Sequence, residues 1–549
     1  MSKKKLDIWT TISFVILITY VLFLIYPMFN LVVESLVNKE TQTLSFEYYQ
    51  KFFQFPYYSN TLINSFKVTV AVTILTLLIG TPMAYFFNMY EIKGKSWLQI
   101  LIIISSMSAP FIGAYSWILL LGRNGVFTNF FKSTFNIQIP DIYGFNGILM
   151  VLTLQLFPLI FLYINGAMKN VDNTLLEAAE NLGYTGLRRF RTIVFPLILP
   201  TILAGSLLVF MRAFADFGTP MLIGEGYRTF PVLIFSEFIG EVTGDKGFAA
   251  AISIIAIGIT TIFFLVQSYI SNRKKFSMSA LHPIEPKKIS GIKNVLLHLY
   301  IYLVIGIAML PQGYVIYTSF LNTKGMLFIE GYSLMSYTQA FDRLGNSIQN
   351  TFVIGGLSLI IIVLLAILIA YISVRRPNIL TKFIDTLSMI PYIIPGSVLG
   401  ISLLAAFLTP PLRLAGGVTI MVIALVIRRL PYTIRSSAAI LQQISISIEE
   451  AAISLGASNL KTFFKITVPM MSAGVIAGAI LSWTTIITEL ATGIILYTGR
   501  TKTLTIAIYT EVIRGNYGIA AALSTILTIL TAGSLILFMK FSKNKDLSV

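Results

Sequence analysis

The sequence predicts an all-α, polytopic membrane protein with about twelve transmembrane helices, arranged as two parallel repeats of six helices. Composition is the first observation: the 549 residues are 56% hydrophobic and only 11% charged, and the mean hydropathy is +0.82. A soluble protein carries about 25% charged residues, so the surplus of apolar side chains has to face lipid. The other two observations are twelve apolar runs and an internal duplication of their motifs.

Each of the twelve runs is about twenty residues or longer, which is the length that an α-helix needs to cross the hydrocarbon core of a bilayer. Between the ninth and tenth runs only a short Thr-Pro-Pro segment interrupts the apolar sequence. The expected spans are 8–33, 61–88, 98–121, 146–168, 192–217, 247–270, 294–318, 350–374, 384–408, 414–436, 466–492 and 517–541.

The first run follows three lysines, as the apolar segment of a signal peptide does. It is too long for that class, and no small-residue cleavage site follows it. We therefore expect a retained membrane helix.

The net charge of +17 indicates orientation rather than nucleic-acid binding, because cytoplasmic loops of membrane proteins are enriched in Lys and Arg. With the N-terminus in the cytoplasm, 26 of the 40 Lys and Arg residues lie in inner segments or at inner helix ends. The sequence thus predicts that both termini are cytoplasmic. The 26 residues are Lys3, Lys4, Lys5, Lys93, Lys95, Lys169, Arg188, Arg189, Arg191, Arg273, Lys274, Lys275, Lys287, Lys288, Lys293, Arg375, Arg376, Lys382, Arg428, Arg429, Arg435, Lys461, Lys465, Lys540, Lys543 and Lys545.

Residues 271–293 are polar, carry two prolines and lack helical periodicity, so we expect a cytoplasmic linker there. It divides the chain into a first transmembrane domain, 1–270, and a second, 294–549.

The two domains repeat each other. Because each holds an even number of spans, both enter the membrane in the same sense, and the repeats are parallel about an axis along the membrane normal, an arrangement found in transporters. The matched segments are Asn64-Ser65-Phe66 with Asn350-Thr351-Phe352, Pro158 with Pro431, Ala204-Gly205 with Ala477-Gly478, Asp216 with Glu489, Glu237 with Glu511, and 247–251 with 518–522.

A polar loop at about 170–196 recurs at about 443–469, in register at an offset of 273 positions. Both copies carry the pattern E-A-A-x-x-x-G-x9-I-x-x-P. In the first copy the pattern residues are Glu177, Ala178, Ala179, Gly183 and Pro196, and in the second they are Glu450, Ala451, Ala452, Gly456 and Pro469. The pattern resembles the EAA loop of the membrane subunits of bacterial binding-protein-dependent ABC importers.

This resemblance implies that each loop forms a short coupling helix that docks on an ATP-hydrolysing subunit. Asp172 or Thr174 is suited to cap the first helix, and Gly183 and Gly456 are suited to end the two helices in a left-handed conformation. The prolines are expected near the start of the next membrane helix. The alternative is a short amphipathic helix that lies on the membrane surface.

Two acidic residues within the spans, Asp216 and Glu489, are repeat mates. A carboxylate at membrane depth normally faces a partner or a watery cavity. Arg212 lies one turn before Asp216, so we expect an ion pair between them, whereas no basic residue lies one turn from Glu489. The two carboxylates either line a translocation path near its outer gate or fix the interface between the halves.

An apolar segment follows each carboxylate, namely 220–224 and 492–496. These segments are either re-entrant gate or docking elements, or loop residues that pack on helix ends. Proline- and glycine-rich stretches at 108–113 and 390–396 predict helix bends, which either expose backbone to the path or are packing kinks.

Several kinds of chemistry are absent from the sequence. There is no cysteine, and His282 and His298 have no companions at metal-ligand spacing, so no metal site and no catalytic residues are expected. There is no G-x-x-x-x-G-K-[ST] loop, so ATP and Mg²⁺ are expected to bind only in a partner ATPase.

Over nearly its whole length the chain resembles a fused permease of a type I ABC importer and is most similar to the ferric iron permease family. The resemblance implies as partners two copies of an ATPase subunit, an extracytoplasmic binding protein and the lipid bilayer of the bacterial inner membrane. Phosphonate, sugar phosphate, polyamine and thiamine are alternative substrates. A secondary transporter, with no ATPase, is the alternative class.

Overall fold

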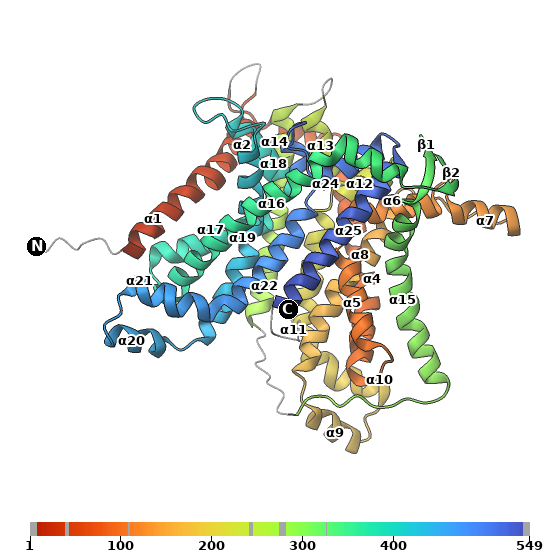
Figure 1. Cartoon of the computed structure of the whole chain (residues 1–549), viewed down its shortest axis with the longest axis horizontal. Helices are drawn as coiled ribbons and strands as arrows, with labels where there is room; N and C mark the ends of the chain where they lie inside the picture. The colour runs from red at the N-terminus through yellow and green to blue at the C-terminus, as the bar shows by residue number, and fades with distance from the viewer. Residues whose placement is uncertain are drawn as a thin grey trace, which may run out of the picture.

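The computed structural model describes residues 8–38, 43–107, 110–240, 245–273, 282–325 and 327–541, and they form an almost entirely helical bundle (Figure 1). Lys3, Lys4, Lys5, Lys274, Lys275, Lys543 and Lys545, which the orientation prediction used, and Ser108-Ala109 of the first proline-rich stretch lie outside these residues.

The first half contains α1 (Ile8–Tyr20), the π-helical turn η1 (Val21–Ile25), α2 (Tyr26–Leu36), α3 (Glu47–Gln54), α4 (Pro56–Met89), α5 (Lys95–Met107), α6 (Pro110–Leu121), α7 (Val126–Phe135), α8 (Phe145–Lys169), α9 (Asn173–Asn181), α10 (Gly186–Arg189), the π-helical turn η2 (Phe190–Val194), α11 (Phe195–Phe214), α12 (Gly218–Ile223), α13 (Phe230–Ile239) and α14 (Lys246–Arg273).

The second half contains α15 (Ile292–Thr318), β1 (Leu321–Lys324), β2 (Leu327–Tyr332), α16 (Met335–Arg375), α17 (Ile379–Ile393), α18 (Gly396–Phe407), α19 (Val418–Gln443), α20 (Ile446–Ser454), α21 (Asn459–Thr462), the π-helical turn η3 (Phe463–Thr467), α22 (Val468–Ile487), α23 (Gly493–Leu496), α24 (Leu504–Ile513) and α25 (Tyr517–Phe541).

All twelve expected spans coincide with helices, but not all of them are simple spans. Within the described residues nine helices are long and apolar enough to cross a membrane, and two bent helix pairs would bring the number to eleven. The bent pairs correspond to the third and ninth expected spans. The tenth corresponds to α19, a helix of 26 residues that includes Arg428, Arg429 and Arg435. These arginines make α19 too polar for a lipid-facing span, so it is buried among other helices.

The internal repeat is visible in both packing and hydrogen bonds. In the first half α8 packs between α4 and α11, and in the second half α19 packs in the same way between α16 and α22. The matched Asn-Ser/Thr segments also make matched bonds. Phe230 N donates to Ser65 Oγ at 2.7 Å, and Leu504 N donates to Thr351 Oγ1 at 2.7 Å. These bonds confirm the duplication at atomic detail.

The first helix of each half crosses to the other half. α1 packs against α16 and α17, and the Trp9 ring lies 4.5 Å from that of Tyr371 and 5.0 Å from that of Phe463. In return α15 packs against α5, α6 and α8, and the Tyr300 hydroxyl donates to Ile79 O at 2.8 Å. The two halves therefore hold each other by exchanged helices.

The linker is packed where it is described. Residues 282–287 run in an extended conformation along the first half. Lys287 N donates to Met89 O at 2.9 Å, Glu91 N donates to Lys287 O at 3.2 Å, and Asn173 N donates to His282 O at 2.9 Å. Two prolines favour this extended backbone, whose exposed N–H and C=O groups can pair with a neighbouring chain segment. This part of the predicted linker, residues 282–287, which we call the strap, is thus hydrogen-bonded to the first half.

One feature departs from an all-helical chain. β1 and β2 form an antiparallel hairpin between α15 and α16, with Thr323 opposite Phe328. In Figure 1 this hairpin lies on the opposite side of the bundle from α9 and α20, which sit along its lower edge. The bundle thus presents the two predicted coupling helices on one side.

Candidate coupling loops and translocation path

The first predicted coupling helix is α9. Its N-cap is Asp172, whose carboxylate accepts from Thr174 N at 2.9 Å and from Thr174 Oγ1 at 2.7 Å. This satisfies a backbone N–H that the first helical turn leaves without a partner. Glu177 is exposed and accepts from the Asn173 side chain at 2.7 Å. Of the two predicted caps, the structure has Asp172.

The second predicted coupling helix, α20, has the same length and starts at the equivalent place. Ser445 is its N-cap and accepts from Ser447 N. Glu450 and Ala451 are exposed and Ala452 is buried, which matches the exposure of Glu177 and Ala178 and the burial of Ala179 in α9. The pattern therefore places its first alanine outward and its second inward in both copies.

Gly183 and Gly456 end the two helices as expected. Their φ angles are +80° and +90°, in the left-handed region that glycine occupies without steric strain. In both loops the residue after the glycine, Tyr184 or Ala457, donates its N–H back to the carbonyl of the second alanine of the motif. These bonds satisfy carbonyls that the last helical turn leaves free.

Both loops expose large apolar side chains on an otherwise polar surface. Leu182 and Leu187 are 76% and 80% exposed in the first loop, and Leu455 is 90% exposed in the second. Apolar side chains that gather on an exposed surface indicate a site of protein contact. The loops thus present what a docking partner would cover.

Pro196 and Pro469 lie further inside a helix than expected. In each half the helical residues begin earlier, at Gly186 or Asn459, and continue to the end of α11 or α22. Each proline therefore lies within one continuous helical span. Each follows a π-helical turn, η2 or η3. Proline lacks an N–H and its ring collides with the carbonyl four residues earlier, and a wider turn relieves both problems.

The two loops are held by different contacts. In the second half the buried Glu449 pairs with Arg375, with Nε 2.8 Å from Oε1, and Arg375 Nη2 donates to Ile444 O at 2.7 Å. At the repeat-related positions the first half has Leu176 and Met89, both buried. Two buried apolar residues of one cluster therefore stand in the first half where an ion pair holds the second loop.

The strap also holds the first loop. Glu180 on α9 accepts from Lys287 on the strap and lies 3.2 Å from Arg189 Nη1. The hydrogen bond and charge of Lys287, with the charge of Arg189, lower the pKa of Glu180 below its usual value. The lowered pKa means that this contact is present at neutral pH and is lost as the pH falls through that pKa.

Within the bundle, Glu489 lies between two arginines of α19. Arg428 Nε is 3.2 Å from Glu489 Oε2, and Arg429 Nη2 binds the same oxygen. Glu489 also accepts from Thr492 N at 3.1 Å. The sequence indicated no basic neighbour for Glu489, because these partners come from a different helix. Arg428 and Arg429 are therefore largely buried partners of Glu489 on a neighbouring helix.

Asp216 makes the same backbone contact as its repeat mate, accepting from Thr219 N at 2.9 Å. The expected ion pair with Arg212 is wrong: no ion pair of Asp216 is found among the described residues. The Arg212 guanidinium lies instead beside the Tyr432 hydroxyl, with Tyr163 and Tyr392 nearby. One helical turn of spacing brings two side chains to one face, but it does not prevent each from finding a closer partner on another helix.

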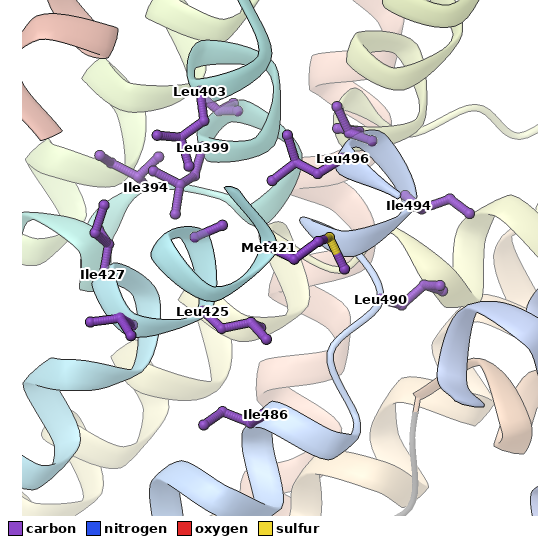
Figure 2. Close-up of a cluster of buried hydrophobic side chains, with 14 of the residues drawn as sticks. Ile394, Leu399, Leu403, Met421, Leu425, Ile427, Ile486, Leu490, Ile494 and Leu496 are labelled. Atoms are coloured by element: carbon purple, nitrogen blue, oxygen red, sulfur yellow. The ribbon is translucent and has the colours of Figure 1, made fainter. Parts of the chain in front are cut away.

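The segments that follow the two carboxylates form the short helices α12 and α23, and both are largely buried. Figure 2 shows Leu490, Ile494 and Leu496 in an apolar cluster with side chains of α18 and α19, including Leu399 and Met421. A Cβ added at Gly218 would lie 3.4 Å from Leu490 of the other half. The start of α12 therefore approaches the second half at Leu490, three residues before α23.

The second proline-rich stretch breaks the helix, as expected. α17 ends at Ile393, α18 begins at Gly396, and the two helices meet at 112°. A Cβ at Gly396 would lie 2.1 Å from Arg428 Nη1, so only glycine leaves room for that guanidinium. The break thus seats one of the two arginines that bind Glu489.

Four further candidates were not predicted from the sequence, namely Arg428, Arg429, Tyr392 and Tyr432. The available signal was the comparison of the repeats, because at the offset of 273 Arg428, Arg429 and Tyr432 replace Gln155, Leu156 and Leu159. Arginines where the sister helix has glutamine and leucine indicate a specific role in one half.

Comparison with known proteins gives two matches to one family model. Residues 76–276 and 362–543 each match the model described as "Binding-protein-dependent transport system inner membrane component". Each match includes one of the two predicted coupling loops and one of the two repeat-related carboxylates, Asp216 or Glu489.

Similar proteins fall into two groups by coverage. The ferric transport system permease protein FbpB of Actinobacillus pleuropneumoniae is 27% identical over 98% of this chain and 78% of its own length. A putative ferric transport system permease protein FbpB of Haemophilus influenzae is 26% identical over 91% of this chain and 80% of its own length. The spermidine/putrescine permease protein PotB of Haemophilus influenzae is 30% identical but covers only 41% of this chain and 77% of its own length.

Proposed function

The chain belongs to the family of binding-protein-dependent transport system inner membrane components, and from this premise we propose that it is the fused permease of an importer for ferric iron. As a member it is a multi-pass inner membrane protein and a transport subunit, and ATP is hydrolysed by a partner ATPase while a binding protein delivers the substrate. The substrate, the stoichiometry and the roles of individual residues belong to the proposal.

One observation carries the choice of iron. Relatives that are named for ferric transport align along 98%, 91% and 89% of this chain, so they share both fused halves. Relatives named for spermidine/putrescine, molybdenum or 2-aminoethylphosphonate transport align along 41%, 38% and 48%. Similarity over both halves supports a shared substrate better than similarity over one half.

We propose that 1–270 and 294–549 each form one transmembrane domain, and that α9 and α20 each dock one ATPase subunit. The exposed apolar side chains of the two loops and their common side of the bundle support this assignment. Since the ATPase acts in the cytoplasm, this side is the cytoplasmic one, with both termini. Asp216, Arg212 and Glu489 then line the path beside α12 and α23.

The test is uptake by vesicles that contain the purified permease and its ATPase, with the binding protein outside. We expect ATP-dependent accumulation of radioactive ferric iron that excess spermidine or 2-aminoethylphosphonate does not inhibit. If no iron is taken up and one of the two compounds is taken up instead, that compound and not ferric iron is the substrate. Uptake that persists without the ATPase would defeat the importer mechanism.

A further inference from the structure

The polar cluster at the seam between the halves contains more positive than negative charge. Three arginines, Arg212, Arg428 and Arg429, stand against two carboxylates, Asp216 and Glu489, and one glutamate serves two of the arginines. Nearby Arg435 and Asp385, whose charged atoms lie 3.5 Å apart, balance each other. One guanidinium in this cluster is thus left without a counter-charge.

Hydrogen bonding identifies Arg212 as that guanidinium. Arg428 and Arg429 both contact Glu489, and Arg428 also donates to Thr492 Oγ1 at 3.2 Å. Arg212 makes no ion pair within the described residues, and it is exposed although it lies one helical turn from the half-buried Asp216. An accessible charge this far inside a helix bundle borders an internal aqueous space.

Three tyrosines surround Arg212 in this space. Tyr163 is 36% exposed in the middle of α8, and Tyr392 and Tyr432 are half-buried, with ring centres 5.3 Å apart. Tyr163 and Arg212 come from the first half, whereas Tyr392 and Tyr432 come from the second. The hydroxyl groups and the guanidinium therefore converge from both sides of the seam.

This set of donors selects a class of ligand. A guanidinium offers paired N–H groups that fit the oxygens of an oxyanion, and phenol hydroxyls can donate further hydrogen bonds to it. A free polyamine would be repelled by the excess positive charge, and the repulsion is stronger away from bulk water. The cluster thus fits a small oxyanion.

We propose that Arg212, Tyr163, Tyr392 and Tyr432 form an oxyanion-binding site on the translocation path. It takes a small oxyanion such as inorganic phosphate, either free or as a ligand of ferric iron; the iron-bound form rests on the function proposed above. Binding at the seam would place the ligand where the two halves separate or close.

The experiment measures binding to the purified full-length chain by equilibrium dialysis, with two probes. One is radioactive inorganic phosphate alone, and the other is radioactive ferric iron supplied as its soluble citrate complex. We expect saturable binding of at least one probe and a loss of about tenfold or more in affinity in Arg212→Gln, since a charge-assisted bond is removed. Arg343→Gln, which changes an exposed arginine of α16, is the matched control and should bind like the wild type.

Tyr432→Phe is a second variant that removes only a hydroxyl group and should weaken binding severalfold even if Arg212→Gln fails to fold. Phosphate binding alone identifies the free anion as ligand, and binding of ferric citrate alone identifies the iron-bound form. No saturable binding by the wild type, or wild-type affinity in Tyr432→Phe and in folded Arg212→Gln, would overturn the site. Iron uptake by the wild-type complex is scored separately, so failure of iron as substrate leaves the phosphate result interpretable.

Discussion

At the scale of residues, the repeat shows how one backbone arrangement can carry two electrostatic environments. Asp216 and Glu489 each accept from the backbone N–H three residues later. Only Glu489 faces two arginines, because α19 has basic residues where α8 has Gln155 and Leu156. The repeat-related position is therefore fixed by ion pairs at Glu489 in the second half, whereas Asp216 in the first half is held by a backbone hydrogen bond and has no ion pair among the described residues.

This difference predicts unequal effects of neutralising the two carboxylates. Among the described residues, Glu489 is the one carboxylate that pairs with Arg428 and Arg429, whose side chains are 17% and 12% exposed, and Glu489→Gln removes it. Leaving buried charges uncompensated should lower the free energy of unfolding by about 3–5 kcal/mol. Asp216→Asn keeps an acceptor for the Thr219 N–H, so it should change the free energy of unfolding by less than about 1 kcal/mol. Thermal unfolding of the purified chain in detergent measures both, and equal losses would contradict the environments described.

The sequence indicated the two carboxylates at these sites, but it did not indicate the residues that they contact. The motif and the offset pointed to Glu489 and Asp216. The sequence did not predict the two arginines that pair with Glu489, and it did not predict that Asp216 makes no ion pair among the described residues. Arg428 and Arg429 lie about sixty positions from Glu489, and only the packing of α19 on α22 brings them together. Sequence spacing gives neighbours along one helix, whereas buried charges choose partners between helices.

At the scale of elements, the two coupling loops share their caps and their glycine ends but differ in what anchors them. The apolar pair Met89 and Leu176 and the ion pair Arg375–Glu449 occupy equivalent places. Replacing a buried ion pair by apolar residues of similar volume is often neutral for stability. The apolar residues of the first half, Met89 and Leu176, are therefore a natural substitute for Arg375 and Glu449 in the second half.

Transplanting the first half's pair into the second half tests this equivalence. Glu449→Leu alone leaves Arg375 buried without its partner and should destabilise the chain by about 3–5 kcal/mol. The double variant Arg375→Met, Glu449→Leu should recover most of that loss, as seen by thermal unfolding. A double variant as unstable as the single one would mean that the loops are not equivalent in packing.

The glycines at the loop ends give a prediction about docking. A Cβ at Gly183 or Gly456 would meet nothing within 4 Å, so alanine there introduces only the strain of a positive φ, roughly 1 kcal/mol. Gly456→Ala should reduce co-purification of the ATPase, and Gly183→Ala with Gly456→Ala should reduce it further. Gly345→Ala, at a site with open space and no positive φ, is the control. Undiminished ATPase binding and transport in the double variant would refute the assignment of α9 and α20 as coupling helices.

Helix positions were largely predictable, and their internal irregularities were not. Apolar length located all twelve segments, yet the π-helical turns before Pro196 and Pro469 and the early starts at Gly186 and Asn459 have no apolar signature. The packing of the strap was not predictable for a related reason, because its contacts with Met89 and Glu91 are made by backbone groups, which leave no mark in the sequence.

At the scale of the whole molecule, duplication and fusion give one chain with two loops on one side of the bundle. The repeat was predictable because motifs recur in register, whereas the exchange of α1 and α15 between halves was not, since no sequence pattern states which apolar helix packs on which.

This architecture predicts the composition of the complex. One permease chain with two docking loops should bind two ATPase subunits, and the similarity of the loops favours identical copies. Mass measurement of the detergent-solubilised complex should therefore give one permease to two ATPases. A complex with two permease chains would contradict the interpretation of a fused, self-sufficient path.

The exchange of α1 has a consequence for biogenesis. Trp9 packs on Tyr371 and Phe463, which the ribosome adds more than 350 residues later. At roughly 5–20 residues per second, α1 is in the bilayer for on the order of 20–90 s before its partners emerge. During that interval α1 lacks its second-half partners, and the nascent first half must keep a place open for α15, which is made before them. The order of translation thus leaves the first helix of the chain to be fixed by helices of the second half.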